Sequence, residues 1–289
     1  RTSDQWRAVA KLDGRRYIRG YDPHGNPQTA RIKMSSGRIA GVVKLLSHLA
    51  GREGFFAGAP VGVAFRNGFV RLDGDKAILE PLTPAHRARF VLPVPYVEGG
   101  MSDAWTRFLT GVLILDPPMA ATAASVPEFI GACLFGLATT FERCMILTGV
   151  GANGKSVLLS VISALFPSEA RCAIKPQAFA REVTLAALAG VRINACNEIP
   201  DVDLAASDAF KAVVSGNEVT AEQKYKDPFT FRPRAGHIFA CNTLPHSKDF
   251  SEGFWRRIAI ITFNREFAET EQDKHLADSI IETELGGVC

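Results

Sequence analysis

The sequence contains a glycine-rich turn in which two glycines, a lysine and a serine follow the spacing G-x-x-x-x-G-K-S. Glycines allow such a turn to fold closely around an anion, so that backbone N–H groups and the N-terminus of the next helix face it. A buried strand is predicted before the turn, over residues 144–148, and a helix after it, over 156–166. The pattern predicts a phosphate-binding loop, and a glycine-rich turn with a solvated lysine is the alternative. The four residues are Gly149, Gly154, Lys155 and Ser156.

A loop of this kind holds a nucleoside triphosphate. Lys155 is expected to contact the β and γ phosphates, and the Ser156 hydroxyl is expected to hold a Mg²⁺ ion. We therefore expect ATP and Mg²⁺ as the cofactors. The residues predicted to bind the nucleotide are Gly149, Gly151, Ala152, Asn153, Gly154, Lys155 and Ser156.

Hydrolysis of the bound triphosphate requires further groups beside this loop. Glu198 follows a strand predicted over 191–196, and Asn242 follows one over 237–241. Open α/β sheets bind ligands at the carboxyl ends of their strands. Glu198 is therefore predicted to be the general base that orients the attacking water, with an ordinary surface carboxylate as the alternative. Asn242 is predicted to hold this water or the γ-phosphate.

Two adjacent arginines, Arg256 and Arg257, precede a strand predicted over 257–263. A guanidinium that reaches the transferred phosphoryl group from a neighbouring subunit accelerates hydrolysis by about 10³–10⁵. We expect one arginine of the pair to be such a finger and the other to form a structural ion pair. A site of this kind is complete only in the assembled oligomer.

The composition indicates a globular protein. With 289 residues, 47% of them hydrophobic, the chain is long enough for two domains. It has no run of about 20 uninterrupted apolar residues, so we expect no membrane span. It also has no charged segment followed by an apolar leader, so we expect a cytoplasmic rather than a secreted protein. Since the chain begins at Arg1, we expect it to be a fragment of a longer protein. The six cysteines lack a C-x-x-C pair and the six histidines lack ligand spacing, so we expect free thiols and no zinc site.

The net charge of +3 is unevenly distributed along the chain. Residues 1–90 contain 16 Lys and Arg against 7 Asp and Glu, whereas residues 91–289 contain 17 against 23. A basic region favours a polyanionic partner, because each neutralised phosphate releases counterions. A solvated basic surface without a partner is the alternative.

The predicted elements divide the chain into three parts. Residues 1–100 are expected to form a smaller α+β region that serves as a collar or linker, 101–142 a helical segment, and 143–289 the phosphate-loop core. Because strands and helices alternate in the core, we predict an α/β fold with a mainly parallel sheet flanked by helices. Further elements are predicted as short strands over 1–34, helices over 39–49, 102–115, 126–142 and 204–215, and hairpins over 62–84 and 219–231.

Several ordered motifs resemble superfamily 3 helicases, of the poxvirus, phage and plasmid primase-helicase family. The resemblance covers roughly residues 60–265. The motifs are "AFRNGFVRL", "LPVPY", W-x-x-F-L from Trp105 to Leu109, "GVGANGKS", "LAGVRINACNE", "FKAVVSGNEVTAEQKYKDPFTFRP", "NTLP" and "GFWRR".

The resemblance implies an AAA+ type ATPase that assembles into a homo-oligomeric ring, usually a hexamer, and moves along DNA. A finger that acts between subunits suits a head-to-tail ring. In this family the segment before the Asn242 strand carries a hairpin that contacts DNA, expected to be a single strand, in the central channel. Its tip here holds Lys224, Tyr225 and Lys226, which suit phosphates and a stacked base. The resemblance also implies a primase domain upstream on the same polypeptide.

Two residues depart from the family pattern. Asn197 replaces the carboxylate often found before the catalytic Glu, so the Mg²⁺ shell would rely on Ser156, phosphates and water. Near Glu222 and Gln223 the family often has a basic residue, which leaves a purely structural hairpin as an alternative. The alternative function is an oligomeric DNA-binding or scaffold module that binds nucleotide with little turnover. A small-molecule kinase fits poorly, since that class does not require the Asn242 and arginine elements.

Overall fold

The computed structural model divides the chain into two compact units, residues 1–58 and 59–289. Each unit is described by itself. The structure describes residues 16–24, 26–31, 35–50, 55–56, 58–113, 117–200, 207–245, 249 and 251–289.

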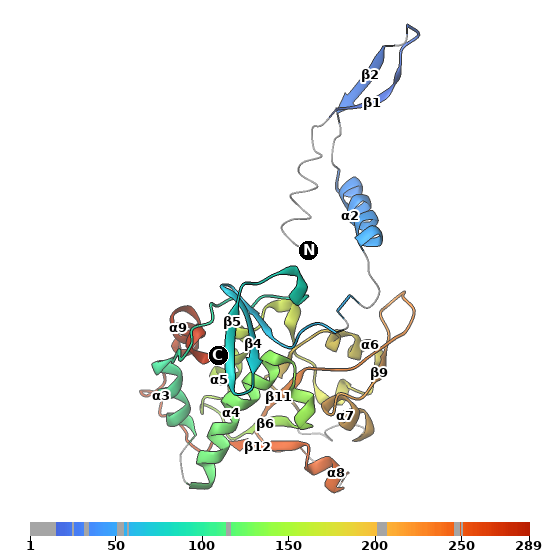
Figure 1. The fold of residues 1–289 in the computed structure, drawn as a ribbon. Helices are drawn as coiled ribbons and strands as arrows, with labels where there is room; N and C mark the ends of the chain where they lie inside the picture. The colour runs from blue at the N-terminus through green and yellow to red at the C-terminus, as the bar shows by residue number, and fades with distance from the viewer. Residues whose placement is uncertain are drawn as a thin grey trace. The chain divides into compact units, whose positions relative to one another are not determined.

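The first unit contains a two-stranded hairpin and a helix (Figure 1). Strands β1 (Arg16–Tyr21) and β2 (Pro27–Arg31) are antiparallel, and α2 spans Ser36–Ala50. In the turn, Asp22 Oδ1 accepts hydrogen bonds from the backbone N–H groups of His24 and Asn26, at 2.9 and 2.8 Å. The two strands agree with the prediction for residues 16–31, and the helix agrees with the one predicted over 39–49; the remaining part of the prediction, over residues 1–15 and 32–34, lies outside the described residues.

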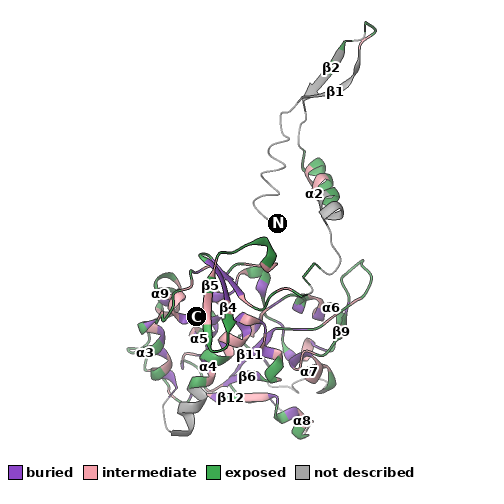
Figure 2. Ribbon diagram, in the orientation of Figure 1, coloured by how far each residue is buried: buried purple, intermediate pink, exposed green. Residues whose placement is uncertain are grey.

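The second unit is built on a five-stranded parallel sheet with the strand order β12-β6-β11-β8-β7. The predicted α/β fold class with a parallel sheet flanked by helices is confirmed (Figure 1). Helices cover both faces of this sheet, and its central strand β11 is buried along its whole length (Figure 2). The strands are β6 (Cys144–Thr148), β7 (Arg171–Cys172), β8 (Ile193–Cys196), β11 (Gly236–Cys241) and β12 (Ile258–Thr262).

Alternating side chains of β6 supply two separate cores. Met145 and Leu147 pack into one core, and Cys144 and Ile146 pack into the other. This alternation is the period of two of a strand buried on both faces. The first core includes side chains of α3 (Asp103–Val112), α4 (Pro117–Phe135), α5 (Lys155–Leu165) and α9 (Leu276–Thr283), and the second includes side chains of α6 (Glu182–Leu185), α7 (Ser207–Val214) and α8 (Glu252–Trp255).

A small antiparallel sheet precedes the helices and shares the first core. It consists of β3 (Val63–Phe65), β4 (Gly68–Asp73) and β5 (Lys76–Glu80), and the predicted hairpin over 62–84 is confirmed. Its residues Val63 and Val70 are buried in the same core as Met145. The contacts therefore divide the chain after Gly58, whereas the sequence pattern places a division at residue 100.

Helix α4 begins earlier and ends earlier than the pattern over 126–142 predicts. It spans Pro117–Phe135, and the next residue, Gly136, has a φ of +68°, which favours glycine. A short 3₁₀ helix over Ala138–Phe141 completes the predicted range. No helix in the described part of the chain, α4 included, is long and apolar enough to cross a membrane.

A second hairpin projects from the region between α7 and β11. Its strands β9 (Val219–Ala221) and β10 (Phe229–Phe231) are antiparallel, as predicted over 219–231. The backbone N–H of Glu222 donates to the carbonyl of Glu182 at 3.3 Å, which ties the start of the hairpin tip to α6.

The start of α3 is held by a three-way contact with the end of α9. The buried Ser102 hydroxyl accepts from the Trp105 N–H at 3.0 Å and donates to Glu284 Oε2 at 2.7 Å. The same carboxylate oxygen accepts from the Ala104 N–H at 3.0 Å. The hydrogen bond from Ser102 is the main reason that the pKa of Glu284 lies below its ordinary value.

We expect Ser102→Ala to lower the free energy of unfolding by about 1–2 kcal/mol, because it removes a helix cap. The loss is largest near neutral pH and declines as the pH falls through the lowered pKa of Glu284, since only the carboxylate accepts both bonds strongly. Urea unfolding with Ser279→Ala, on an exposed position of α9, as the control measures the difference. Equal stability of the two variants would exclude the proposed cap.

Candidate nucleotide site

The predicted phosphate loop connects β6 to α5 through three residues with positive φ. These angles are +146° at Gly149, +56° at Ala152 and +94° at Gly154. A Cβ on Gly154 would lie 2.7 Å from Val112 Cγ1 and 3.0 Å from Phe108 Cε2 on α3. The loop therefore requires glycine at Gly154 both for its backbone angle and for the close approach of α3.

The Lys155 ammonium lies inside the loop and is held by loop acceptors. Its Nζ donates to the carbonyls of Gly149 and Val150 at 2.5 and 2.9 Å, and to Asn153 Oδ1 at 3.0 Å. Burial of this ammonium lowers the pKa of Lys155 from its ordinary value. Phosphate oxygens can accept hydrogen bonds from the same ammonium. Because these oxygens are anionic, such bonds are stronger than the bonds to neutral carbonyls.

Asn153 anchors the loop to the end of β12, the strand that pairs with β6. Its Nδ2 donates to the carbonyl of Phe263, just past β12, at 3.1 Å, and the Phe263 N–H donates to Thr148 at 2.7 Å. The N–H of Phe267 donates to the carbonyl of Ala152 at 3.2 Å. The sequence pattern assigns Asn153 only to the nucleotide, and nothing in it signals this second, structural contact.

Ser156 is exposed in the first turn of α5. Within the described part of the chain its hydroxyl has no hydrogen-bonding partner. A free hydroxyl beside a phosphate site suits a Mg²⁺ ion, which takes oxygen ligands and keeps several of its waters. Among the described residues, no cluster of three His, Cys, Asp or Glu side chains forms a separate metal site.

Glu198 and Asn242 lie at the same edge of the sheet as the loop. β8 ends two residues before Glu198, and Asn242 directly follows Cys241, which pairs in register with Thr148 of β6. Both side chains are exposed. The N–H of Ile199 donates to the carbonyl of Ala240 at 3.0 Å, so the turn that carries Glu198 is fixed to β11.

A buried polar contact secures β8 beneath Glu198. The fully buried Asn194 accepts from the Ile174 N–H at 2.6 Å, and its Nδ2 lies 2.9 Å from the Ile174 carbonyl and 3.2 Å from His237 Nδ1. Burial lowers the pKa of His237 to about 3, so this histidine is neutral at pH 7. A neutral ring can accept the Asn194 hydrogen bond, which joins β8 to β11.

Arg256 and Arg257 lie at the opposite edge of the sheet and differ in burial. Arg257 is buried, and its guanidinium donates to Ser215 Oγ at 2.8 Å, to the Gly253 carbonyl, and to Glu142 at 3.2 Å. The Arg256 side chain is 57% exposed and contacts the same carboxylate at 2.7 Å. Arg257 thus has the surroundings of a structural residue, and Arg256 is the accessible one.

The parallel register separates these arginines from the loop of the same chain. Ile258 pairs with Cys144 and Thr262 pairs with Thr148, so Arg257 precedes β12 while the loop follows β6. Five residues of strand span about 16 Å. The structure does not bring the arginine pair together with the loop, Glu198 and Asn242.

The hairpin tip exposes the three residues predicted to contact DNA. Tyr225 is 90% exposed with φ of +64°, a value that non-glycine residues seldom adopt. Lys224 Nζ lies 5.0 Å from the Tyr225 ring centre, and Lys226 Nζ donates to Gln223 Oε1 at 2.7 Å. The tip therefore presents an exposed aromatic ring with one lysine over it and a second lysine at the next position of the chain.

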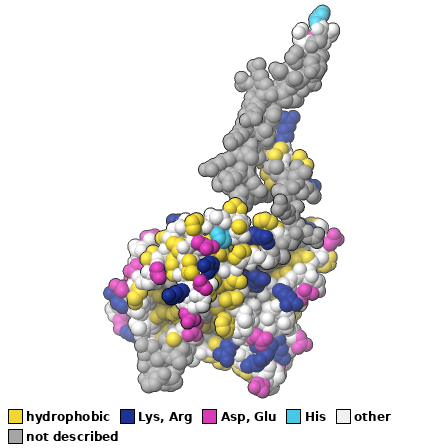
Figure 3. Space-filling view, viewed as in Figure 1, with side chains coloured by type: hydrophobic (Ala, Val, Ile, Leu, Met, Phe, Trp, Pro, Cys, Tyr) yellow, Lys and Arg dark blue, Asp and Glu magenta, His cyan; other side chains and the backbone are white. Residues whose placement is uncertain are grey.

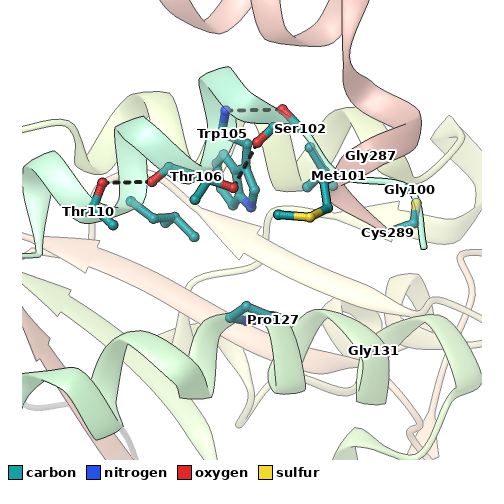
Figure 4. Close-up of a pocket in the computed structure, with 12 residues that line it drawn as sticks. Gly100, Met101, Ser102, Trp105, Thr106, Thr110, Pro127, Gly131, Gly287 and Cys289 are labelled. Carbon is teal, nitrogen blue, oxygen red and sulfur yellow. Dashed lines mark hydrogen bonds between the residues drawn. The ribbon is translucent and has the colours of Figure 1, made fainter.

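A separate cavity of about 520 Å³ lies between α3, α4 and the C-terminal residues (Figure 4). Trp105, Met101 and Pro127 line it, and none of its lining residues is charged or belongs to the phosphate loop. Its lining does not suit a triphosphate.

On the face of the molecule seen in Figure 3, Lys and Arg side chains are interspersed with Asp and Glu.

Comparisons with known proteins agree with this architecture. A family model described as a family of unknown function (DUF5906) matches residues 147–257. The chain is 26% identical over 212 residues to a putative helicase, L207/L206, of Acanthamoeba polyphaga mimivirus. The match covers 71% of this chain and 22% of that protein.

Solved structures of the NrS-1 C-terminal region have the same fold. One apo structure matches with a TM-score of 0.57 and 13% identity over 100% of this chain and 69% of the other. A second, the A form, matches with a TM-score of 0.55 and 15% identity over 90% and 60%. The chain therefore has the α/β fold of these structures. It spans less than two thirds of the length of the mimivirus protein and of the A-form chain.

The two arginines are expected to differ in their effects on stability. Arg257→Ala should lower the free energy of unfolding by about 2–3 kcal/mol, because it removes charged hydrogen bonds in a buried position. Arg256→Ala should cost less than about 1 kcal/mol, since its ion pair is exposed to solvent. Chemical unfolding measures both, with Arg66→Ala at an exposed position as the control. A larger loss of unfolding free energy from Arg256→Ala than from Arg257→Ala would contradict these roles.

Proposed function

We propose that this chain is the ATP-dependent, ring-forming DNA helicase module of an AAA+ type protein, of the superfamily 3 primase-helicase kind. The observation that carries the proposal is the division of functional groups between the two edges of the parallel sheet. The loop, Glu198 and Asn242 lie at one edge, and Arg256 lies at the other. The mimivirus relative, named as a putative helicase, supports the class of activity.

ATP would be bound by the residues of the loop, with Lys155 on the β and γ phosphates. The Ser156 hydroxyl would hold a Mg²⁺ ion, which would neutralise charge on the phosphate oxygens. Glu198 accepts a proton from the attacking water, and the Asn242 amide positions this water or the γ-phosphate. Asn197, exposed beside Glu198, offers a neutral oxygen where a second carboxylate would add charge.

Arg256 completes the site of the neighbouring subunit. Since about 16 Å of strand separates Arg256 from its own loop, its guanidinium can reach a γ-phosphate only across a subunit interface. An interface that pairs two different surfaces closes into a ring, and we propose a hexamer. Arg257 and Glu142 hold the turn that presents Arg256.

The hairpin tip is proposed to contact a single DNA strand in the central channel. Lys224 and Lys226 would bind backbone phosphates, and the exposed Tyr225 ring offers a face for a base to stack on. The channel position of the tip connects ATP hydrolysis to movement along the strand. An upstream primase domain on the same polypeptide is part of this proposal.

We expect the wild-type protein to hydrolyse ATP faster with single-stranded DNA present. Glu198→Gln should lower kcat by about 10²–10⁴ while ATP still binds, because it removes only the base. Lys155→Ala should abolish both binding and hydrolysis. Phosphate release and binding of a fluorescent ATP analogue measure these effects, with Glu282→Gln, an exposed residue of α9, as the control. Tight binding without phosphate release by the wild-type protein would favour the scaffold function instead.

Mixing two inactive variants tests the action between subunits. Arg256→Ala and Lys155→Ala proteins, each inactive alone, should regain roughly a quarter of the wild-type rate when mixed equally, because a random ring forms about that share of complete interfaces. The ATPase rate is measured after co-assembly on DNA. Co-assembled rings without any rescue would contradict a finger supplied by the neighbour.

A further inference from the structure

Three arginines meet at the amino edge of β8 and β11, away from the nucleotide site. Arg192 directly precedes β8, with its N–H bonded to Ala170 at 2.8 Å and its carbonyl bonded to the Gly236 N–H at 3.0 Å. Because Ile193 pairs with Gly236 in a parallel register, Ala235 lies beside Arg192 and Arg234 comes one residue earlier, close enough for its charge to act on Arg192. Arg89 joins them, since its Nη1 is 3.1 Å from the position of a Cβ on Gly190. We call Arg89, Arg192 and Arg234 the arginine triad.

The triad concentrates positive charge around a partly buried guanidinium. Arg192 Nε is buried without a hydrogen-bonding partner, and the guanidinium lies 5.8 Å from the centre of the Phe90 ring. In the part of the chain that the structure describes, neither the Arg192 nor the Arg234 side chain has a carboxylate partner. Burial, and then the charges of Arg234 and Arg89, lower the pKa of Arg192 to about 10.

Arg192, partly buried beside the like charge of Arg234 and without a carboxylate partner, is unfavourable unless an anion binds there. Arg234 and Arg89 are exposed, so an anion can reach the triad from solvent. Guanidinium groups present paired N–H donors that match phosphate oxygens in two-point contacts. The chemistry of the triad therefore suits a phosphate group better than a single carboxylate.

The triad lies at the base of the hairpin that carries the proposed DNA contacts. From Lys226 at the tip, the chain passes through β10 and the exposed Arg232 to Arg234. Eight residues of chain span at most about 28 Å. A polyanion that contacts the tip can therefore continue along the same hairpin to the triad.

We infer that the arginine triad binds backbone phosphates of the single DNA strand whose bases meet the hairpin tip. This inference rests on the proposed function, because it takes DNA as the strand in the channel. The triad adds sequence-independent affinity and gives the strand a second point of contact beyond the tip. The phosphate contacts fix the position of the strand and read no sequence.

The salt dependence of oligo(dT) binding to the wild-type chain and its variants tests the inference. Each phosphate contact on a single strand contributes about −0.7 to the slope of log Kobs against log salt. The Arg89→Gln and Arg234→Gln double variant should therefore have a slope about 1.4 units shallower than wild type, and Arg234→Gln alone about 0.7 units shallower. Arg107→Gln, at an exposed position of α3, is the matched control and should keep the wild-type slope.

Variants of the tip separate this inference from the proposed function. If Lys224→Gln and Lys226→Gln weaken DNA binding while the folded triad variants keep the wild-type slope, the triad is not a DNA contact and the helicase proposal stands. If wild-type protein does not bind oligo(dT) at low salt, the proposed function fails. An acidic peptide that binds wild type and not the triad variants, with unchanged DNA slopes, would assign the triad to a protein partner and overturn the inference. Thermal unfolding verifies that each variant is folded.

Discussion

The parallel alignment of β6, β8, β11 and β12 is the constraint on which the rest of the structure depends. Residues that directly follow these strands lie together at one edge of the sheet, and residues that directly precede them lie together at the opposite edge. The loop, Glu198 and Asn242 share the first edge, while Arg256 and the arginine triad share the second. One sheet therefore separates the loop proposed to bind a triphosphate from the arginine proposed to complete its hydrolysis, and under this proposal the reaction requires assembly.

The loop holds its own lysine through hydrogen bonds within the loop. Three acceptors surround Lys155 Nζ, and one of them, Asn153, is itself fixed to the Phe263 carbonyl. This arrangement keeps the ammonium at the centre of the loop at a desolvation cost, which the lowered pKa of Lys155 reflects. In the proposed function, a phosphate bound at this loop would replace the neutral carbonyl acceptors of Lys155 Nζ with anionic ones, so the same burial would favour its binding.

Local sequence patterns predicted the helices and strands of the fold, but they did not predict the surroundings of the side chains. The glycine spacing and the alternating strands identify the loop and the sheet, because their signals lie within a few consecutive residues. The different burial of Arg256 and Arg257 could not be predicted, since it depends on Glu142, 115 residues away from Arg257, and on Ser215, 42 residues away. The boundary after Gly58 was missed because the apolar residues of β3 to β5 join a core supplied by distant helices. The functional roles of Glu198, Asn242 and Lys224 stay predictions.

Cross-linking between subunits tests the central claim most directly. One protein carries Val150→Cys, at a loop position that is 54% exposed, and the other carries Arg256→Cys, both with the exposed Cys289 replaced by serine. With a non-hydrolysable ATP analogue and single-stranded DNA, a short bis-maleimide should link the two different chains and leave either protein alone uncoupled. Assembled rings that give no link between the chains, or a link within one chain that carries both cysteines, would contradict a nucleotide site completed by the neighbour.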